Sequence, residues 1–478
     1  MSDESIRGMT ATEALERIGT RDLSAREFAS AFDGLRDELN AFLWAREEVP
    51  APDDGTLSGI PVAVKDIFCT KGVPTTAGSK ILEGYIPPYT ATAVSRLEAA
   101  GAATLAKTNM DEFAMGSSNE NSAYGDVLNP WDHERVPGGS SGGSTAAVAG
   151  GLAPVAIGTD TGGSIRQPAS LCGIVGLKPT YGAISRYGMI AFASSLDQCG
   201  PLTRSVADAA LLLRELEGRD PRDSTSTGIP GGVELPSDGD LSGLRFGVAT
   251  DFSHEAEGVE PDVAQLFQAT LSLIEAAGGE LVEVELPNAE HGLSAYYVIA
   301  PAEASANLAR FDGVRYGLRV DGDGDSHQQT LGEMYERTRS QGFGAEVKRR
   351  IMLGTYALSS GYYDAYYGQA QRVRTKIADD FAGAFGKCDF VVTPTSPTVA
   401  FQRGARTQDP FAMYLSDYFT VPMSLAGIPA ISIPAGLGAA SGLPVGFQVA
   451  GPAFSESGLL QAAHALESAI GFEGRPSG

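Results

Sequence analysis

Two glycine- and serine-rich segments are the part of this chain most capable of chemistry: residues 136–144 read VPGGSSGGS and residues 158–166 read GTDTGGSIR. Glycine lets the backbone turn tightly and approach a ligand closely. Serine hydroxyls can attack a substrate or relay a proton. Loops that bring bare N–H groups and several hydroxyls together can stabilise an oxyanion. The composition therefore indicates nucleophilic catalysis by serine.

A serine nucleophile needs a base, and histidine is the usual one. Of the five histidines, only His133 lies beside these loops, in the polar segment 129–135. We expect a surface loop there and no catalytic role. Residues 139–143 match the G-x-S-x-G pattern of a nucleophile elbow. The preceding residues, 134–138, read ERVPG and do not form a strand pattern, so we interpret that match as accidental.

Lysine can replace histidine as the base when it is uncharged. A free lysine has a pKa of about 10.4, and a base at neutral pH needs about 7–8, a difference of about 4 kcal/mol that burial can supply. Lys65 lies in the apolar segment 61–67, PVAVKDI, which we expect to be a buried strand. The competing interpretation is a lysine that snorkels from a strand end or pairs with Asp66.

The elements that must position these residues alternate between helix and strand. We expect two amphipathic helices within residues 10–48, and further helices at 90–101, 145–150, 262–277 and over much of 344–384. We expect strands at residues 61–67, 103–106, 153–157, 244–248, 280–286, 390–393 and 444–450. This alternation predicts an α/β layer architecture around a mixed sheet.

The candidate catalytic residues lie before residue 166, yet further candidates lie beyond residue 290. The chain also has no internal repeat. We therefore interpret residues 1–478 as a single interleaved domain. Its parts are N-terminal helices at about 10–50, a catalytic core at about 55–215, a loop at about 219–241 and the remainder of the domain at about 242–472.

The net charge is strongly acidic. The chain has 59 acidic and 35 basic residues, a formal net charge of −24, and only eight lysines. Such an excess indicates adaptation to high salt, where carboxylates stay solvated and their repulsion is screened. The alternative is an acidic surface that repels nucleic acid. Both interpretations disfavour direct phosphate binding, which needs clusters of lysine and arginine.

Cysteine spacing and hydropathy suggest a cytoplasmic protein. The four cysteines have no CxxC spacing, which fits a reducing compartment and disfavours a structural zinc site. The segment MSDESI lacks the pattern of a signal peptide, and no run of about 18 apolar residues exists to span a membrane. The acidic segment 321–325 lacks the glycine and glutamate positions of a calcium loop. We expect no metal site.

Taken together, these residues resemble the amidase signature family. The resemblance rests on GGSSGGS at 138–144, GTDTGGSIRQP at 158–168, GIVGLKPT at 173–180 and Lys65, which occur in this order at family-like spacing. The similarity extends from about residue 10 to about residue 470. It implies an amidase-signature fold, an α/β fold with a central mixed β-sheet covered by helices on both faces.

The resemblance also implies a role for each residue. Ser164 would be the nucleophile, and Lys65 the base that draws a proton from it through Ser140. Ser140 would be held by a cis peptide bond. The oxyanion hole would consist of four backbone N–H groups, those of Thr161, Gly162, Gly163 and Ser164. The resemblance leaves structural roles for Ser141, Ser144 and Arg166, with Arg166 bound to a carboxylate such as that of Asp160.

Three further stretches, residues 108–122, 185–198 and 349–367, resemble the glutamine-hydrolysing subunits of aspartyl/glutamyl-tRNA amidotransferases within this family. A glutamine α-carboxylate favours a guanidinium, and its α-ammonium favours a carboxylate. By resemblance Arg350 would bind the carboxylate and Asp417 the ammonium, with Tyr296 alongside. Tyr297 is an alternative to Tyr296, and a solvated basic helix face is the alternative for Arg350.

The same resemblance predicts the cofactors and partners. No cofactor is expected on this chain; without a Walker motif, ATP and Mg²⁺ are expected on a partner subunit. The expected complex is a heterotrimer that also contains a small linker subunit and a tRNA-binding subunit of the kinase type. Ammonia from glutamine would convert Glu-tRNA(Gln), Asp-tRNA(Asn) or both, so mischarged tRNA would be contacted only indirectly.

Two other functions remain open at this point. The first is a free-standing amidase that acts on small or aryl amides. The second is a non-catalytic scaffold that docks a tRNA-binding partner, against which stand the intact residues Lys65, Ser140 and Ser164.

Overall fold

The computed structural model describes residues 2–52, 54–256, 258–321 and 330–476. These residues build one 11-stranded sheet with the strand order β1-β3-β2-β4-β6-β5-β10-β11-β9-β7-β8. The strands are β1 (Phe42–Ala45), β2 (Pro61–Lys65), β3 (Ala103–Thr108), β4 (Val155–Asp160), β5 (Val175–Lys178), β6 (Gln198–Thr203), β7 (Arg245–Ala249), β8 (Glu280–Val284), β9 (Phe390–Pro394), β10 (Ala430–Leu437) and β11 (Pro444–Ala450). The sheet is mixed, because β2 runs parallel to β3 and β4, and β7 runs parallel to β8 and β9, whereas the other pairs are antiparallel.

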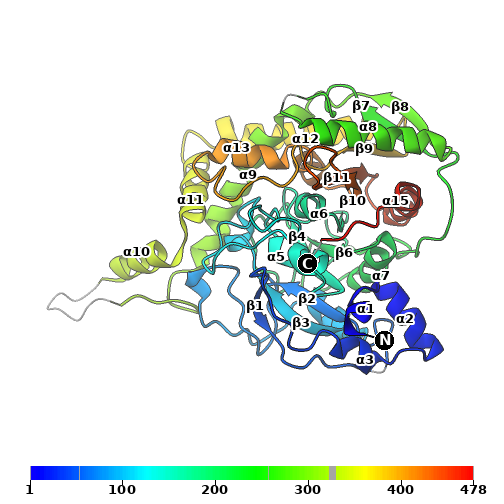
Figure 1. Ribbon diagram of the computed structural model, residues 1–478. Coiled ribbons are helices and arrows are strands. Elements are labelled where there is room, and N and C mark those ends of the chain that lie inside the picture. Colours follow the sequence, from blue (N-terminus) through cyan, green and yellow to red (C-terminus); the bar gives the residue numbers. More distant parts are fainter. Residues whose placement is uncertain (1, 53, 257, 322–329, 477–478) are drawn as a thin grey trace.

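Helices cover both faces of this sheet, as the resemblance implied (Figure 1). The α-helices are α1 (Asp3–Arg7), α2 (Ala11–Thr20), α3 (Ala25–Ser30), α4 (Thr92–Ala99), α5 (Gly142–Ala149), α6 (Arg166–Cys172), α7 (Val206–Leu216), α8 (Pro261–Ala276), α9 (Gly292–Asn307), α10 (Leu331–Gly342), α11 (Ala345–Ala357), α12 (Gln369–Ala384), α13 (Pro410–Tyr414), α14 (Val421–Ala426) and α15 (Glu456–Ile470). Short 3-10 helices are η1 (Lys80–Leu82), η2 (Glu112–Ala114), η3 (Ala289–His291), η4 (Leu308–Arg310) and η6 (Leu415–Asp417), and η5 (Asp364–Gly368) is a π-helix. Helices α5 and α6 pack on each other and on strands of the sheet centre, while α15 packs on α7, α8 and β10. Helices α9, α11, α12 and α14 form a further helical layer.

The N-terminal segment differs from the sequence prediction. The two expected helices are present as α2 and α3, but helix ends at Ser30, and β1 forms an edge strand paired with β3. Gly34 and Asn40 both have positive φ, which lets the chain turn before β1. Pairing with the free edge of β3 satisfies the backbone groups of β1, a tertiary interaction that local periodicity does not reveal.

Most other expected elements lie where the sequence patterns put them. Residues 219–241 contain no helix or strand, as expected. The helical region at 344–384 is divided into α11, the π-helix η5 and α12. Of the acidic segment 321–325, only Asp321 lies within the described residues. Among the helices of the described residues, none is both long enough and apolar enough to cross a bilayer.

The sheet brings the candidate catalytic segments together. Strands β2 and β4 are parallel neighbours, with Val64 opposite Ile157, so their carboxyl ends meet at one edge of the sheet. Lys65 is the last residue of β2, and the second glycine-rich loop follows β4 directly. Helix α5 begins within the first glycine-rich loop and packs on β2, β3 and β4. Parallel pairing therefore brings both loops close to Lys65.

Close packing of α5 explains one of the glycines. A Cβ on Gly143 would lie 2.3 Å from the carbonyl oxygen of Asn109 and 2.7 Å from that of Ala41. The backbone N–H of Gly143 donates a hydrogen bond to the same Asn109 carbonyl, at 3.1 Å. Since backbone atoms cannot move away as a flexible side chain can, only glycine fits this position.

We expect Gly143→Ala to lower the free energy of unfolding by about 3 kcal/mol, the cost of a backbone collision in a packed core. The matched control is Gly383→Ala in α12, where a Cβ would meet no atom within 4 Å. That change should raise stability by about 0.5–1 kcal/mol, because alanine favours helix. Urea denaturation of both variants measures the difference, and equal stabilities would contradict this account.

Candidate active site

Lys65 is completely buried and surrounded by hydroxyl groups. Its Nζ lies 2.7 Å from Ser140 Oγ, 2.9 Å from Ser141 Oγ and 2.8 Å from Thr159 Oγ1. The competing interpretation, a pair with Asp66, is wrong, because the Asp66 carboxylate faces Lys107 Nζ at 2.9 Å. The snorkelling interpretation is also wrong, since no part of the Lys65 side chain reaches solvent. Within the described residues, Lys65 makes no ion pair.

This environment favours the uncharged amine. Burial lowers the pKa of Lys65 to about 7, against the opposing charges of Asp111, Asp160 and Asp197. Those carboxylates are not in contact with the amine, so they only partly offset the loss of hydration. A substantial fraction of Lys65 is therefore neutral near pH 7 and able to accept a proton.

Hydrogen-bond accounting indicates where the amine can accept that proton. As an ammonium, Lys65 donates to all three hydroxyls. As a neutral amine it must accept one hydrogen bond instead. Ser141 cannot supply it, because its hydroxyl donates to the Thr159 carbonyl at 3.1 Å. The hydroxyls of Ser140 and Thr159 remain as possible donors to the neutral amine, and the resemblance assigns that part to Ser140.

The two glycine-rich loops touch next to these hydroxyls. The peptide bond between Gly139 and Ser140 is cis, as the resemblance implied. The backbone N–H of Ser141 donates to the Ser164 carbonyl oxygen at 3.2 Å. Ser164 keeps 7% of its surface exposed, and its hydroxyl makes no hydrogen bond within the described residues. Ser164 thus has an accessible hydroxyl, whereas Ser140 is completely buried and contacts Lys65.

Backbone N–H groups are free around Ser164. Within the described residues, no hydrogen bond uses the N–H of Thr161, Gly162, Gly163 or Ser164. The neighbouring carbonyls are occupied: Thr420 Oγ1 donates to that of Gly162 at 2.6 Å, and the Gln167 N–H to that of Gly163 at 2.8 Å. Free amides beside a serine are the donors that a tetrahedral oxyanion requires.

A buried ion pair between Arg166 and Asp160 stabilises the loop that carries Ser164. Arg166 makes two parallel hydrogen bonds with Asp160, Nε to Oδ2 at 2.9 Å and Nη2 to Oδ1 at 2.8 Å. The predicted link between these residues is therefore confirmed. Ser144 also has the expected structural contacts, to Thr108 Oγ1 at 2.6 Å and to the Ile157 carbonyl at 3.2 Å. The structural role predicted for Ser141 is incomplete, because its hydroxyl also contacts Lys65.

Asp417 reaches the same loop from a distant part of the chain. A Cβ on Gly163 would lie 3.3 Å from Asp417 Oδ1. Ser117 Oγ donates to Asp417 Oδ2 at 2.6 Å, whereas Oδ1 is buried and has no hydrogen-bond partner within the described residues. Burial raises the pKa of Asp417 to about 7. A carboxylate oxygen that is buried and unpaired is costly unless a cation binds it.

Arg350 supplies the opposite charge, from α11. Its Nε donates to Glu346 Oε1 at 2.8 Å, and its guanidinium carbon lies 5.2 Å and 5.5 Å from the ring centres of Tyr297 and Tyr414. Its two terminal nitrogens donate to no group of the described residues. Burial opposes the charge, but Tyr297 and Glu346 outweigh it and hold the pKa of Arg350 above its usual range. The solvated-face interpretation is wrong, since Arg350 is only 3% exposed.

The two candidate tyrosines have separate places. Tyr296 packs on the catalytic loop, where a Cβ on Gly162 would lie 2.8 Å from its Cζ atom. Tyr297 stacks on Tyr414 at a ring-centre distance of 3.8 Å and lies beside Arg350. Tyr296 therefore borders the loop of Ser164, and Tyr297 helps hold the guanidinium.

Sequence reasoning missed several residues of this site: Ser117, Thr159, Gln167, Glu346, Tyr414 and Thr420. Thr159 and Gln167 lie inside the segment 158–168, and Ser117 lies inside 108–122; both segments were singled out from the sequence, but these residues were assigned no role. Glu346, Tyr414 and Thr420 act through contacts between segments that are far apart in the chain.

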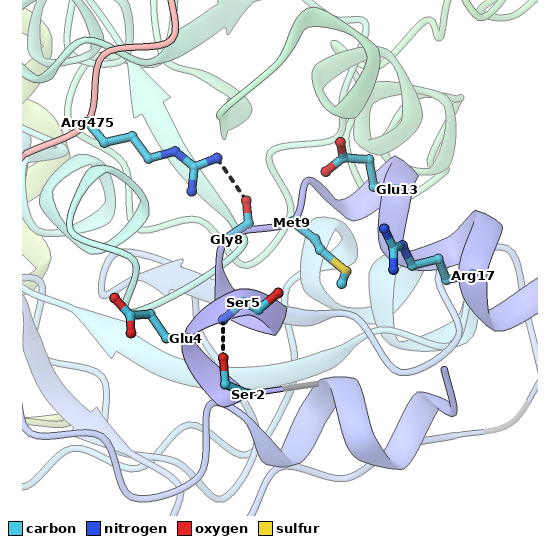
Figure 2. A pocket seen from close by; sticks show the side chains of 8 residues that line it. All are labelled: Ser2, Glu4, Ser5, Gly8, Met9, Glu13, Arg17 and Arg475. Atoms are coloured by element: carbon cyan, nitrogen blue, oxygen red, sulfur yellow. Dashed lines mark hydrogen bonds between the residues drawn. The ribbon is translucent and has the colours of Figure 1, made fainter. Parts of the chain in front are cut away.

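Two pockets lie away from these residues. One, of about 510 Å³, lies between α1, α2 and the C-terminal segment, where Arg475 Nη2 donates to the Gly8 carbonyl at 2.9 Å (Figure 2). His133 lines a second cavity of about 790 Å³ together with Trp131 and Arg204. Neither contains Lys65, Ser140 or Ser164. Within the described residues, no group of three or more potential metal ligands is arranged to hold an ion.

Comparison with known proteins identifies relatives over nearly the whole chain. The sequence model described as Amidase matches residues 34–460. The glutamyl-tRNA(Gln) amidotransferase A subunit of Rubrobacter xylanophilus is 54% identical over 489 residues, covering 98% of this chain and 99% of that protein. The protein of the same name from Anaeromyxobacter dehalogenans is 59% identical over 416 residues, covering 87% and 83%. The crystal structure of the Thermotoga maritima protein of that name superposes with a TM-score of 0.78 at 42% identity, covering 97% and 95%.

Replacing Lys65 by methionine keeps the volume of the stem and removes the amine. We expect Lys65→Met to lower kcat by about 10³-fold or more, because the relay loses its base. The matched control is Lys178→Met. Lys178 is also buried and donates to the carbonyls of Pro179 and Ile428. It makes no hydrogen bond with Ser140, Ser141 or Ser164. Equal losses of activity in folded samples of both variants would contradict a catalytic role for Lys65.

The two pKa values of about 7 predict the pH profile. Amide hydrolysis needs neutral Lys65, and binding of an ammonium needs ionised Asp417, so both groups must lose a proton as pH rises through about 7. We expect log(kcat/KM) for an α-amino acid amide to rise below pH 7 with a slope of about 2. In Asp417→Asn the slope should fall to about 1. A wild-type profile that is flat from about pH 6 to about pH 8 would be incompatible with this assignment.

Proposed function

The chain belongs to the amidase family, and from that premise we propose that it is the glutamine-hydrolysing subunit of a tRNA-dependent amidotransferase. One observation carries the choice of substrate. Among the described residues, Oδ1 of Asp417 next to Gly163 has no partner, and the terminal nitrogens of Arg350, whose positive charge acts on Asp417, have none either. An amide with a zwitterionic amino acid head satisfies both, whereas a simple or aryl amide leaves Asp417 Oδ1 and the terminal nitrogens of Arg350 without partners.

In the proposed mechanism, Lys65 accepts the hydroxyl proton of Ser140 while Ser140 takes that of Ser164. Ser164 Oγ attacks the side-chain amide carbon of glutamine, and the carbonyl oxygen gains the negative charge that the free N–H groups stabilise. The C–N bond then breaks, and the proton returns through Ser140 to the leaving nitrogen as ammonia departs. Water attacks the remaining ester by the same relay, which releases glutamate and restores Ser164.

The partner subunits carry the rest of the reaction. We infer a tRNA-binding kinase-type subunit that uses ATP and Mg²⁺, and a small linker subunit, in a cytoplasmic heterotrimer. Ammonia from this chain would amidate Glu-tRNA(Gln), Asp-tRNA(Asn) or both. The net charge of −24 supports tRNA binding by a partner, since phosphates are repelled by such a surface. We attribute this acidic excess to function at high salt.

An exposed aromatic surface supports docking of a partner near the site. It consists of Met352, Leu353, Tyr356, Tyr362, Tyr363 and Tyr366 on α11, the following turn and η5. Tyr356 is 50% exposed, and its ring centre lies 4.6 Å from that of Tyr362. Exposed tyrosine clusters are typical of protein interfaces. Because α11 also carries Arg350, a partner bound there would lie close to the glutamine pocket.

The central test is Ser164→Ala in the purified complex. We expect ammonia release from glutamine to fall by about 10³-fold or more, since the nucleophile is lost. An electrophilic glutamine analogue should add one acyl group to Ser164 of the wild-type chain, and mass spectrometry of the peptide detects it. Undiminished glutaminase activity would remove this function. Rapid turnover of simple amides by the chain without partners would favour a free-standing amidase, and failure to form the adduct would favour a scaffold.

The docking surface has its own test. We expect Tyr356→Ser with Tyr362→Ser to weaken association with the partner subunits by about 10-fold or more, because both aromatic anchors are removed. Phe454→Ser is the control, since Phe454 is a similarly exposed aromatic residue outside this surface. Isothermal titration calorimetry measures both, and equal affinities for the two variants would place the partner elsewhere.

A further inference from the structure

Gln167 has a side chain whose two ends lead to different parts of the site. It lies on α6, three residues after Ser164, and is completely buried. Its Oε1 accepts a hydrogen bond from the N–H of Gly139 at 3.1 Å. Its Nε2 donates to the Ser117 carbonyl at 3.0 Å. A single amide therefore joins the first glycine-rich loop to the segment that contains Ser117.

Each end of the Gln167 side-chain amide contacts a residue that adjoins or binds a group of the proposed site. Gly139 is joined to Ser140 by the cis peptide bond, so the first contact fixes the residue next to the relay hydroxyl. Ser117 Oγ donates to Asp417 Oδ2 at 2.6 Å, so the second contact fixes the residue that holds the ammonium-binding carboxylate. The backbone N–H of Gln167 also bonds to the Gly163 carbonyl, which ties the amide to the nucleophile loop.

The surroundings allow the amide only one orientation. Its oxygen must face the Gly139 N–H, and its nitrogen must face the Ser117 carbonyl, so a flipped amide would set donor against donor and acceptor against acceptor. A Cβ on Gly138 would lie 2.5 Å from Gln167 Oε1, and a Cβ on Gly139 would lie 2.1 Å from Asp111 Oδ2. The backbone beside the amide is therefore packed too closely to shift.

We infer that Gln167 is a positioning residue that holds the relay serine and the ammonium-binding carboxylate at a set separation. This inference rests on the proposed glutaminase function. The amide touches neither glutamine nor the reacting atoms. It acts by keeping the pocket for the amino acid head in register with Ser140 and Ser164, so that a bound glutamine presents its side-chain amide to the nucleophile.

Substitutions can test the two hydrogen bonds of the Gln167 side-chain amide separately. Gln167→Met removes both hydrogen bonds at similar volume. Gln167→Glu keeps an acceptor for the Gly139 N–H but replaces the donor to the Ser117 carbonyl with a second oxygen. Ser117→Ala breaks only the last link, to Asp417. Glutaramate, the monoamide of glutaric acid, is the matched substrate, because it keeps the carboxylate and side-chain amide of glutamine and lacks the α-ammonium.

We expect Gln167→Met to lower kcat on both glutamine and glutaramate by about 10–100-fold, since a small displacement of Ser140 affects every amide. We expect Gln167→Glu and Ser117→Ala to lower the ratio of kcat/KM for glutamine to that for glutaramate by about 10-fold, chiefly through a higher KM for glutamine. The difference between these two patterns would establish that the amide serves both ends.

A buried amide that contacts neither Gly139 nor Ser117 is the control. Asn129 is completely buried, and its Nδ2 donates to the carbonyls of Val136 at 3.0 Å and Leu171 at 3.1 Å. Asn129→Leu should lower Tm and leave the glutamine-to-glutaramate ratio as in the wild type. If Gln167→Met lowers Tm in the same way and leaves kcat and KM of the folded fraction unchanged, the inference is overturned.

These measurements distinguish failure of the positioning role from failure of the proposed glutaminase function. If the wild-type complex does not prefer glutamine to glutaramate, the glutaminase function is wrong whatever the variants do, and the inference falls with it. If the wild type prefers glutamine but the ratio is unchanged in both Gln167→Glu and Ser117→Ala, the function stands and the positioning role is overturned.

Discussion

The burial of one lysine without a counter-charge is the constraint on which the rest of this structure depends. Lys65 has only hydroxyl groups within hydrogen-bond distance among the described residues, and burial brings its pKa to about 7. A carboxylate in contact with the amine would restore the charge and remove its ability to accept a proton. Lys107, equally buried, has such a carboxylate partner, since its Nζ lies 2.9 Å from Asp66 Oδ1. Both lysines are completely buried, so they differ in the groups that contact their amines and not in their burial.

Glycine makes the surrounding geometry possible. The loops that hold Ser140 and Ser164 approach other segments so closely that a Cβ on Gly139, Gly143 or Gly163 would collide with neighbouring atoms. This close packing places two hydroxyls beside the amine and leaves free N–H groups beside the nucleophile. The sheet adds the remaining requirement, since parallel β2 and β4 end at the same edge. The close packing of the loops and the parallel direction of β2 and β4 thus together bring the loops close to Lys65.

The parts of this site that sequence could predict are those with local signals. Lys65 was recognisable because a charged residue lay within an apolar strand pattern, and the serines because they lay in glycine-rich loops. Strand β1 was missed because its pairing with β3 is a tertiary interaction. Gln167 lay in a segment that the sequence marked, but its role depends on contacts with Gly139 and Ser117, which are distant in the chain. Tyr414 and Glu346 gave no local signal, since the contact between them joins two distant segments. Catalytic roles for the named residues stay predictions until the variants are measured.

The two tasks of the site are divided along the chain. The groups proposed for bond cleavage lie between Lys65 and Ser164, whereas those that would select the amino acid head, Tyr296, Arg350 and Asp417, come from the later half of the chain. Of these, Tyr296 and Asp417 meet the first half at Gly162 and Gly163. Such a division is modular in the evolutionary sense. Changes in α9, α11 or η6 could exchange one acyl donor for another while the proton relay is inherited intact, so new specificities can arise without reinventing the nucleophile.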